Sequence, residues 1–400
     1  MANTFSRLSF IFALPLSLSS FSSFSAETNV TTIANRDPMQ LGLSSLFAFG
    51  GSSVSDDVVQ TLQGGGHDPN RNGFTVQNVE LTLSGAVDPF WDAQASVILL
   101  IDKEGETVVE LEEAFVLSRE LRAGLQLKAG QFFTEFGRQN SQHPHTWAFA
   151  DQPVILTRLF GGDGLRSQGA RLAWLMPTAW FSELNIGAQN ANGETVTSFL
   201  SAPGEEIAGY TLTERQQRNA ADLLYSLRWL NGFDVAETVS VNIGASGLTG
   251  PNATGSNTTT NIYGADLYLK WQPAQNQRGF PFIAWQTEVL KRRYTAEDST
   301  TLEQEVLNDW GGYTQALWGI KPGWVAGVRY ERADASGDNA DDVLRNERRR
   351  IAVNMSWYAT EYSKLRLQIN RDRAQHLDKA ATSVWLQMEY NLGSHAAHTF

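Results

Sequence analysis

Short segments in which apolar and polar side chains alternate recur along most of this chain. In segment 348–358, for example, Ile351 and Val353 share one face and Arg350 lies on the other. A period of two places successive residues on opposite faces of a β-strand. Alternating strands of about ten residues are typical of a membrane β-barrel. Sixteen segments show this pattern: 40–52, 73–86, 90–102, 107–119, 124–137, 166–176, 180–190, 220–231, 236–248, 260–272, 280–292, 309–320, 324–333, 348–358, 362–371 and 382–392.

The connections between these segments alternate between long and short. Short ones include the turns at 88–89 and 321–323. Outer-membrane barrels have short periplasmic turns and long external loops. We therefore predict an all-β fold, a transmembrane antiparallel β-barrel of about 16 strands with both chain ends in the periplasm. The long connections are 53–72, 138–165, 191–219, 249–259, 293–308, 334–347 and 372–381, and the link at 103–106 is the short exception among them.

Aromatic residues gather near the short turns, where they suit a membrane–water boundary. Trp180, Trp324 and Tyr362 are examples. Barrels carry such aromatic girdles, although the same rings could also fill the core of a β-sandwich. The chain ends at Phe400, shortly after the last alternating segment. A terminal aromatic residue of this kind is shared by many bacterial outer-membrane barrels.

The N-terminus has the features of an export signal. Arg7 precedes the apolar run LSFIFALPLSL, and small residues follow near Ala26. We predict a signal peptide at 1–26, a barrel at 27–400 and a location in the bacterial outer membrane. After the N-terminus, the sequence has no run of about 18 apolar residues, the length that would predict a membrane-spanning helix. The chain has no Cys, which excludes a disulfide scaffold, and its net charge of −12 argues against nucleic acid as a partner.

The connection 138–165 is too long and too apolar for an ordinary surface turn. Loops of this length are usually functional or disordered, and side chains such as Trp147, Phe149 and Phe160 favour burial over disorder. We predict that this third external loop folds into the barrel and constricts the pore. The residues expected to act at the constriction are Arg138, His143, His145, Asp151 and Arg158.

The stretch 73–177 resembles a known group of proteins. The similar parts are VDPFWDA, VVELEEAFV, KAGQFFTEFGRQNSQHPH and GGDGLRSQGARLAWL, and the tail HAAHTF is similar as well. They resemble bacterial outer-membrane proteins often labelled zinc-regulated TonB-dependent outer membrane receptors. LKAGQFFTEFG is more distantly similar to phosphate-selective porins. The resemblance implies an outer-membrane barrel and a link to zinc. TonB-dependent receptors hold a plug within about 22 strands, whereas alternation from about residue 40 leaves no room for a plug.

Two histidines in the long loop form a candidate metal site. Imidazole pairs bind Zn²⁺, which takes about four ligands. His143 and His145 could supply two of them, and Asp151 a third. The alternative is that both histidines only pack or contact solvent. His395 and His398 in the tail could also capture a metal, or simply belong to a flexible terminus.

Charged residues at predicted lumen positions could set a field across the pore. Acidic and basic rows on opposite walls would filter polar solutes, although lumen charges could also simply pair with one another. Strict alternation places Glu113 on the lipid face, which predicts a β-bulge nearby. The predicted pore-lining charges are Glu80, Glu110, Glu112, Lys128, Arg171, Arg228, Arg329, Arg350, Lys364 and Arg366.

These patterns predict a porin-like channel for the passive diffusion of small hydrophilic solutes or ions. The alternative is a receptor or uptake barrel for a zinc-related ligand, bound through external loops and His143/His145. We expect no enzyme, because neither Gly-x-Ser-x-Gly nor His-Glu-x-x-His nor a nucleotide-binding motif occurs. We expect no resident cofactor, with Zn²⁺ as the open possibility. The expected partners are the lipid bilayer, lipopolysaccharide and small polar solutes, and a homotrimer remains open.

Overall fold

The computed structural model describes residues 39–102, 105–119, 121–201, 203–336 and 342–393. The predicted signal peptide at 1–26, the tail histidines His395 and His398, and Phe400 lie outside the described residues.

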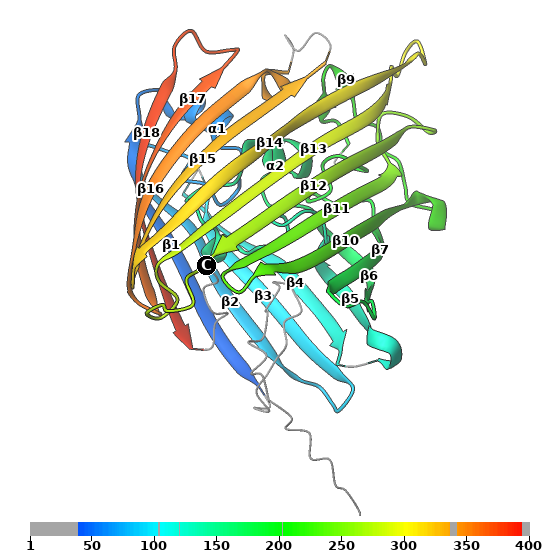
Figure 1. The fold of residues 1–400 in the computed structure, drawn as a ribbon. Helices are drawn as coiled ribbons and strands as arrows, with labels where there is room; N and C mark the ends of the chain where they lie inside the picture. The colour runs from blue at the N-terminus through cyan, green and yellow to red at the C-terminus, as the bar shows by residue number, and fades with distance from the viewer. Residues whose placement is uncertain (1–38, 103–104, 120, 202, 337–341, 394–400) are drawn as a thin grey trace, which may run out of the picture. The chain divides into compact units, whose positions relative to one another are not determined.

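Sixteen antiparallel strands form a closed barrel, in which strands that follow one another in the chain are neighbours and β1 pairs with β18 (Figure 1). The predicted fold class and strand count are confirmed. The barrel strands are β1 Gln40–Ser52, β2 Gly73–Ala86, β3 Trp91–Ile101, β4 Thr107–Ser118, β5 Leu125–Phe133, β6 Arg166–Leu175, β7 Phe181–Asn190, β10 Leu223–Ala236, β11 Val239–Pro251, β12 Thr259–Trp271, β13 Phe282–Glu297, β14 Gln304–Lys321, β15 Trp324–Ala335, β16 Arg348–Thr360, β17 Ser363–Ala374 and β18 Ala381–Gly393.

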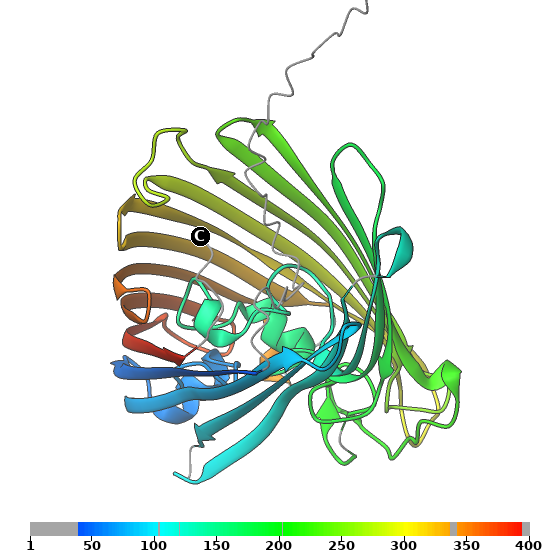
Figure 2. The same cartoon turned by 90° about the horizontal axis from the view of Figure 1, so that it is seen from below.

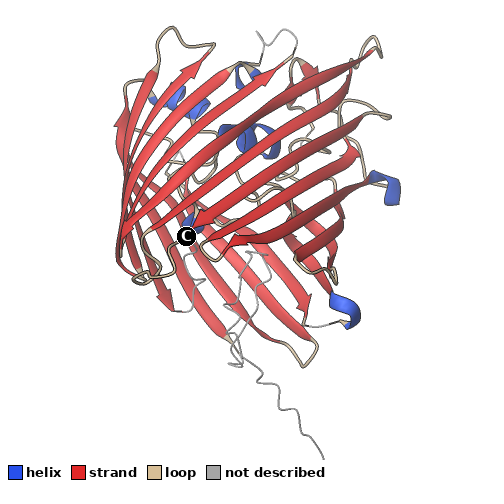
Figure 3. Cartoon of the chain, in the orientation of Figure 1, coloured by secondary structure: helices blue, strands red, loops and turns tan. Residues whose placement is uncertain are grey.

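In the part of the chain that the structure describes, helices occur only in the connections between strands (Figure 3). None of the helices in the described residues is long and apolar enough to cross a membrane. The elements outside the barrel wall are α1 Asp56–Leu62, α2 Val154–Phe160, the short hairpin β8 Glu206–Ile207 and β9 Tyr210–Thr211, and the 3₁₀ turns η1 Arg122–Gly124, η2 Pro144–Thr146, η3 Ala220–Asp222 and η4 Val343–Arg345.

Apolar side chains on the outer face of the barrel point away from its interior. Leu227 and Leu367 are 50% and 48% exposed, whereas their neighbours Ser226 and Gln368 are buried inside. The same alternation recurs in most strands, so the barrel is apolar outside and polar inside. This is the inverse of a soluble core and matches a barrel surrounded by lipid. The protein is therefore placed in the bacterial outer membrane.

A β-bulge in β4 brings two consecutive glutamates to the inner face. Ser96 of β3 pairs with Glu113, but Val97 pairs with Leu111, so Glu112 has no residue opposite it. Both Glu112 and Glu113 are buried, at 0% and 4% exposure. A bulge places two residues of one strand opposite one of its partner and re-aims side chains. The predicted irregularity near Glu113 is thus confirmed.

Several predicted strand boundaries are wrong, chiefly because some strands continue through polar residues beyond the segment in which apolar and polar side chains alternate. The predicted connections 293–308 and 249–259 shrink to the residues between Glu297 and Gln304 and between Pro251 and Thr259. Arginine and acidic side chains in these extensions still form backbone ladders, since cross-strand pairing is not limited to apolar residues. In contrast, β5 ends earlier than predicted, at Phe133, and the third loop begins at 134.

Candidate functional site: a loop anchored inside the barrel

The connection 134–165 between β5 and β6, here called the inward loop, runs inside the ring of strands (Figure 2). Its first residues are held by the wall of β11 and β13. The Gly137 N–H donates to Ser246 Oγ at 3.0 Å, and the Arg138 N–H donates to Glu288 Oε1 at 2.7 Å. Gly137 has a φ of 59°, a left-handed conformation that favours glycine. The chain thus leaves the strand and enters the lumen at a defined turn.

Apolar side chains of the inward loop are buried inside the barrel, as predicted. Trp147 and Phe149 are 3% and 1% exposed. The helix α2 begins at Val154, directly after Pro153, and its apolar side chains pack against the strands and against the connection 191–222. Burial of one large apolar side chain stabilises by roughly 1.5–3 kcal/mol, so this cluster holds the helix in place. The buried cluster members within the inward loop are Phe136, Val154, Ile155, Leu156, Leu159, Phe160 and Leu165.

The middle of the inward loop is attached to the wall of β16 and β17 through its backbone. The carbonyl oxygens of His145 and Trp147 accept from Lys364 at 3.2 Å and from Arg366 at 2.8 Å. The Ala150 N–H donates to Gln368 at 2.7 Å. Backbone groups removed from water need such partners, because an unsatisfied buried group costs about 1–3 kcal/mol. The lumen side chains of β17 therefore serve as a scaffold for the loop.

Asp151 forms the centre of a buried ionic network. Its carboxylate accepts from Arg329 at 2.5 Å and from Arg350 at 2.9 Å. Gln368 and Asn370 also donate to it, at 2.9 and 2.6 Å. Asp151 is 0% exposed, so it neither joins the histidines nor faces the channel, contrary to both predictions. Arg329 of β15 and Arg350 of β16 hold this carboxylate through charge-assisted hydrogen bonds, which are stronger than neutral ones.

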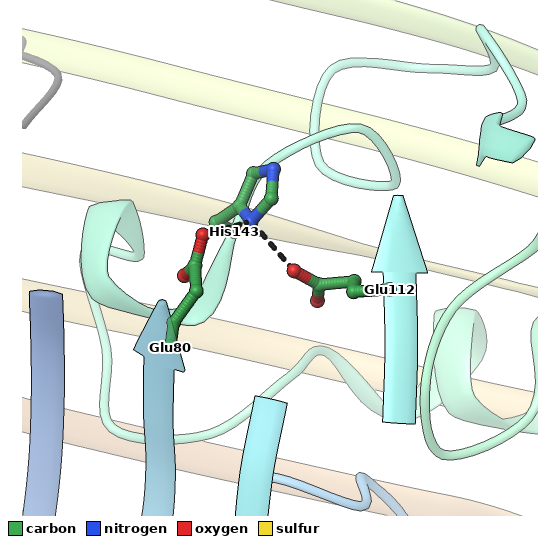
Figure 4. A group of neighbouring side chains, drawn as sticks. All are labelled: Glu80, Glu112 and His143. Carbon is green, nitrogen blue, oxygen red and sulfur yellow. Dashed lines mark ion pairs between the residues drawn. The ribbon is translucent and has the colours of Figure 1, made fainter. Parts of the chain in front are cut away.

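A second buried cluster joins the loop histidines to acidic residues of β2 and β4 (Figure 4). His143 Nδ1 lies 3.0 Å from Glu80 Oε1 and 2.8 Å from Glu112 Oε2. On the other side of the ring, His143 Nε2 lies 3.1 Å from Glu113 Oε2. His145 Nδ1 lies 3.1 Å from the second oxygen of Glu80. The structure therefore brings both predicted histidines together, and replaces Asp151 with glutamates as their neighbours.

The carboxylates around His143 determine its protonation. Burial by itself would lower the pKa of the His143 imidazole, but the carboxylates of Glu80 and Glu112 outweigh burial and raise this pKa well above its ordinary value. Without another cation, the ring therefore carries a positive charge at neutral pH and pairs with the glutamates. Its side chain remains 16% exposed, so the cluster is reached from the open part of the lumen.

The predicted pore-lining charges lie on the inner face, and each has a polar or charged partner. Arg228 pairs with Asp266 at 2.8 Å, and Arg171 lies 3.7 Å from Glu135. Glu110 accepts from Arg166 at 2.6 Å. Paired buried charges largely cancel each other's field, so this arrangement favours the alternative in which lumen charges pair. The remaining predicted charges pair similarly: Lys128 with Glu113, Arg329 with Glu331, Arg350 with Asp372, Lys364 with Glu389, and Arg366 with Gln387.

Fewer polar side chains of the inward loop are partly exposed than the predicted set of constriction residues. Arg138, His143 and Arg158 are partly exposed, whereas His145 and Asp151 are buried. The Arg138 guanidinium lies over the Tyr268 ring at 3.8 Å. Arg158 donates to the carbonyl oxygens of residues 345 and 346 at 3.3 and 2.7 Å. Any solute that passes the loop therefore meets cationic side chains with fixed positions.

Sequence reasoning missed the wall residues that receive the loop. Glu288, Glu331 and Asp372 are 0–1% exposed and accept from loop backbone or lumen arginines. A signal was available, because each acid occupies a polar position within an alternating apolar strand. The partner of each could not be inferred, since the contacting residues lie far apart in the chain. Arg138 and Glu288, for instance, are separated by 150 residues.

Comparison with solved structures finds barrels of outer-membrane channels. The chain is similar to the outer membrane channel DcaP of Acinetobacter baumannii, with a TM-score of 0.56, 10% identity, and 88% of this chain and 96% of that chain covered. An anion-selective porin from Comamonas acidovorans gives a TM-score of 0.54 at 7% identity over 88% of this chain and 99% of that one. OprB of Pseudomonas putida gives 0.53 at 9% identity over 88% and 94%.

Sequence comparison adds one similar protein. An uncharacterized protein of Aquifex aeolicus (strain VF5) is 29% identical over 393 residues, covering 88% of this chain and 78% of that protein. No protein-family model matches the chain. The solved barrels therefore establish the fold: this is an outer-membrane β-barrel with the architecture of porins. Its strand number differs from the barrel of about 22 strands typical of TonB-dependent receptors.

Proposed function

We propose that the protein is a porin-like channel for the passive diffusion of small hydrophilic solutes or ions, and that the inward loop limits the size of what passes. The anchoring of this loop on several inner walls is the observation that carries the proposal. Glu288 holds its start, Asp151 binds the arginines of β15 and β16, and His143 meets β2 and β4. A loop held at so many points narrows the lumen permanently.

Barrel size supports passage of polar solutes. Barrels of sixteen to eighteen strands leave an aqueous channel when nothing fills them. The inner face here is polar, and the loop adds the partly exposed groups of Arg138, Gln142, His143 and Arg158. Charged and hydrogen-bonding groups close to a passing solute select by charge and size. These loop side chains keep partial exposure inside the barrel, so they are the groups that set selectivity.

Deletion of the loop tests the size limit. Removal of residues 142–160 with the ends rejoined should increase single-channel conductance in planar bilayers and admit larger sugars in liposome swelling, with the barrel still assembled. A matched control is deletion of 299–302, which shortens an exposed turn between β13 and β14. The control should leave conductance near the wild-type value. If the loop deletion leaves conductance and size limit unchanged, the loop does not constrict the pore.

One observation favours the second candidate, a receptor or uptake barrel for a zinc-related ligand. The cluster of His143 with Glu80 and Glu112 offers nitrogen and oxygen ligands at the lumen. Saturable uptake of a zinc species without measurable passage of sugars would favour this candidate. Sugar flux that rises linearly with sugar concentration would favour the porin-like channel.

A further inference from the structure

Three side chains from separate parts of the chain converge at the inner wall. Glu80 comes from β2, Glu112 from the bulge of β4, and His143 from the inward loop (Figure 4). One ligand atom of each lies within 4.8 Å of the other two. All three are mostly or fully buried, and Glu112 Oε1 accepts no hydrogen bond from the described residues. A buried carboxylate oxygen without a donor is free to accept the charge of a bound cation.

The distances require only a small expansion to hold a metal ion. His143 Nδ1 lies 3.0 and 2.8 Å from the nearest oxygens of Glu80 and Glu112. In a tetrahedral zinc site with bonds of about 2.0–2.1 Å, neighbouring ligand atoms are about 3.3 Å apart. The side chains would therefore move apart by a few tenths of an ångström. Glutamate side chains adopt such shifts by rotation of their terminal torsion, which is broad.

A carboxylate on the far side of the imidazole orients His143 for this role. Glu113 Oε2 lies 3.1 Å from His143 Nε2, and Glu113 Oε1 lies 3.8 Å from Lys128. Metal-binding histidines usually donate their other N–H to a carboxylate, which fixes the tautomer and raises the basicity of the ligating nitrogen. When a metal ion replaces the proton on Nδ1, the Nε2–H would still donate to Glu113, and the Nδ1 lone pair would be left for an ion between Glu80 and Glu112.

We propose that Glu80, Glu112 and His143 form a binding site for a divalent transition-metal ion, which links the inward loop to β2 and β4. His145 holds the second oxygen of Glu80 at 3.1 Å and so positions that ligand. Three protein ligands leave a fourth position for water or a passing ligand, and the partial exposure of His143 gives access from the lumen. Mixed nitrogen and oxygen donors suit Zn²⁺ better than Ca²⁺ or Mg²⁺, which prefer oxygen alone.

Zinc titration of the folded full chain in detergent tests the site. The background variant carries His395→Ala and His398→Ala, so that the tail cannot contribute. Isothermal titration should then show one saturable Zn²⁺ equivalent, and Zn²⁺ should raise the thermal transition in proportion to the logarithm of its excess. Mg²⁺ should give a far weaker response. Zinc X-ray absorption should show one imidazole with oxygen ligands and no sulfur.

Single substitutions separate this site from adventitious binding. His143→Asn and Glu112→Gln should each weaken zinc binding by about 100-fold or more, and Glu113→Gln by about 10–100-fold, as for other outer-shell partners. The control His376→Asn removes a histidine outside the cluster, which contacts Thr61, and should change nothing. Zinc binding that His143→Asn and Glu112→Gln leave intact, or no saturable binding in the background variant, would overturn the proposal. None of these measurements needs current through the barrel, so the site and the channel are judged separately.

Discussion

Asn in place of Asp151 is expected to release the inward loop without unfolding the barrel. Asp151 accepts four side-chain hydrogen bonds and is 0% exposed. Asp151→Asn keeps the shape of the side chain but removes its negative charge. Arg329 and Arg350 then lose one carboxylate while remaining buried, and the amide nitrogen of the new side chain faces their donor groups. The strands themselves pair through backbone ladders that this substitution does not touch.

The expected cost follows from what the arginines retain. Breaking a buried ion pair by removal of one partner costs about 3–5 kcal/mol when the other charge is left alone. Here Arg329 keeps Glu331 at 2.7 Å and Arg350 keeps Asp372 at 2.8 Å. The loss should therefore be smaller, roughly 2–3 kcal/mol in the free energy of loop docking. At about 1.4 kcal/mol per tenfold, the released population should rise roughly 30- to 150-fold.

Trypsin cleavage measures that population. Cuts after Arg138 and Arg158 require the loop to leave its anchored position, so their rate tracks the released fraction when docking is fast. Mass spectrometry of the fragments separates these cuts from cuts in external loops. Asp163→Asn is the matched control, because Asp163 lies in the same loop, is 30% exposed and sits 3.8 Å from His67. If Asp151→Asn is cut as slowly as wild type, or Asp163→Asn equally fast, the assigned role of Asp151 is wrong.

Three further predictions concern the outer face, one buried carboxyl and one turn. Leu227→Arg should cost about 2–4 kcal/mol of barrel stability in refolding titrations. Ser240→Glu, on the inner face opposite Lys270, should cost far less. Equal costs would mean that the lipid-facing and lumen-facing sides are assigned wrongly. Burial and the neighbouring Asp151 raise the pKa of Asp68 to about 7, so its contribution to folding is present below about pH 4 and is lost as pH rises through 7. Thermal stability relative to Asp68→Asn should therefore fall from pH 5 to pH 8, and a constant difference would contradict this sign. Gly137→Ala should speed cleavage of the inward loop, because its Cβ would meet Glu288 Oε2 at 2.6 Å and φ is positive; Gly204→Ala, with a positive φ but open space, is the control.

Strand positions could be predicted from the sequence because lipid outside the barrel and water inside it impose a period of two on apolar and polar side chains. Leu367 and Gln368 alternate between these two environments, and each strand repeats the pattern. The bulge near Glu113 was readable for the same reason, since a buried charge on the lipid face would be costly. Strand ends beyond the lipid were not readable, because the backbone ladder of β13 and β14 continues where the alternation of apolar side chains stops.

The contacts inside the lumen could be predicted only in part. Length and apolar content predicted that the loop around Trp147 is buried, and the spacing of His143 and His145 predicted that they lie together. The sequence could not tell which wall each polar group meets. Asp151 was expected beside the histidines, but the arginines of β15 and β16 compete for it and form the stronger charged hydrogen bonds. Such contacts depend on barrel closure, which no local pattern encodes.

Barrel closure also determines when the inward loop acquires its structure during assembly. Asp151 is synthesised long before Arg329 and Arg350, which follow it by 178 and 199 residues. Until β15, β16 and β17 have joined the sheet, the carboxylate has no cationic partner and gains more from water than from burial. Docking of the loop through Asp151 therefore follows the pairing of β15, β16 and β17. A barrel that lacks these strands would therefore lack the anchors that hold Asp151 inside the lumen.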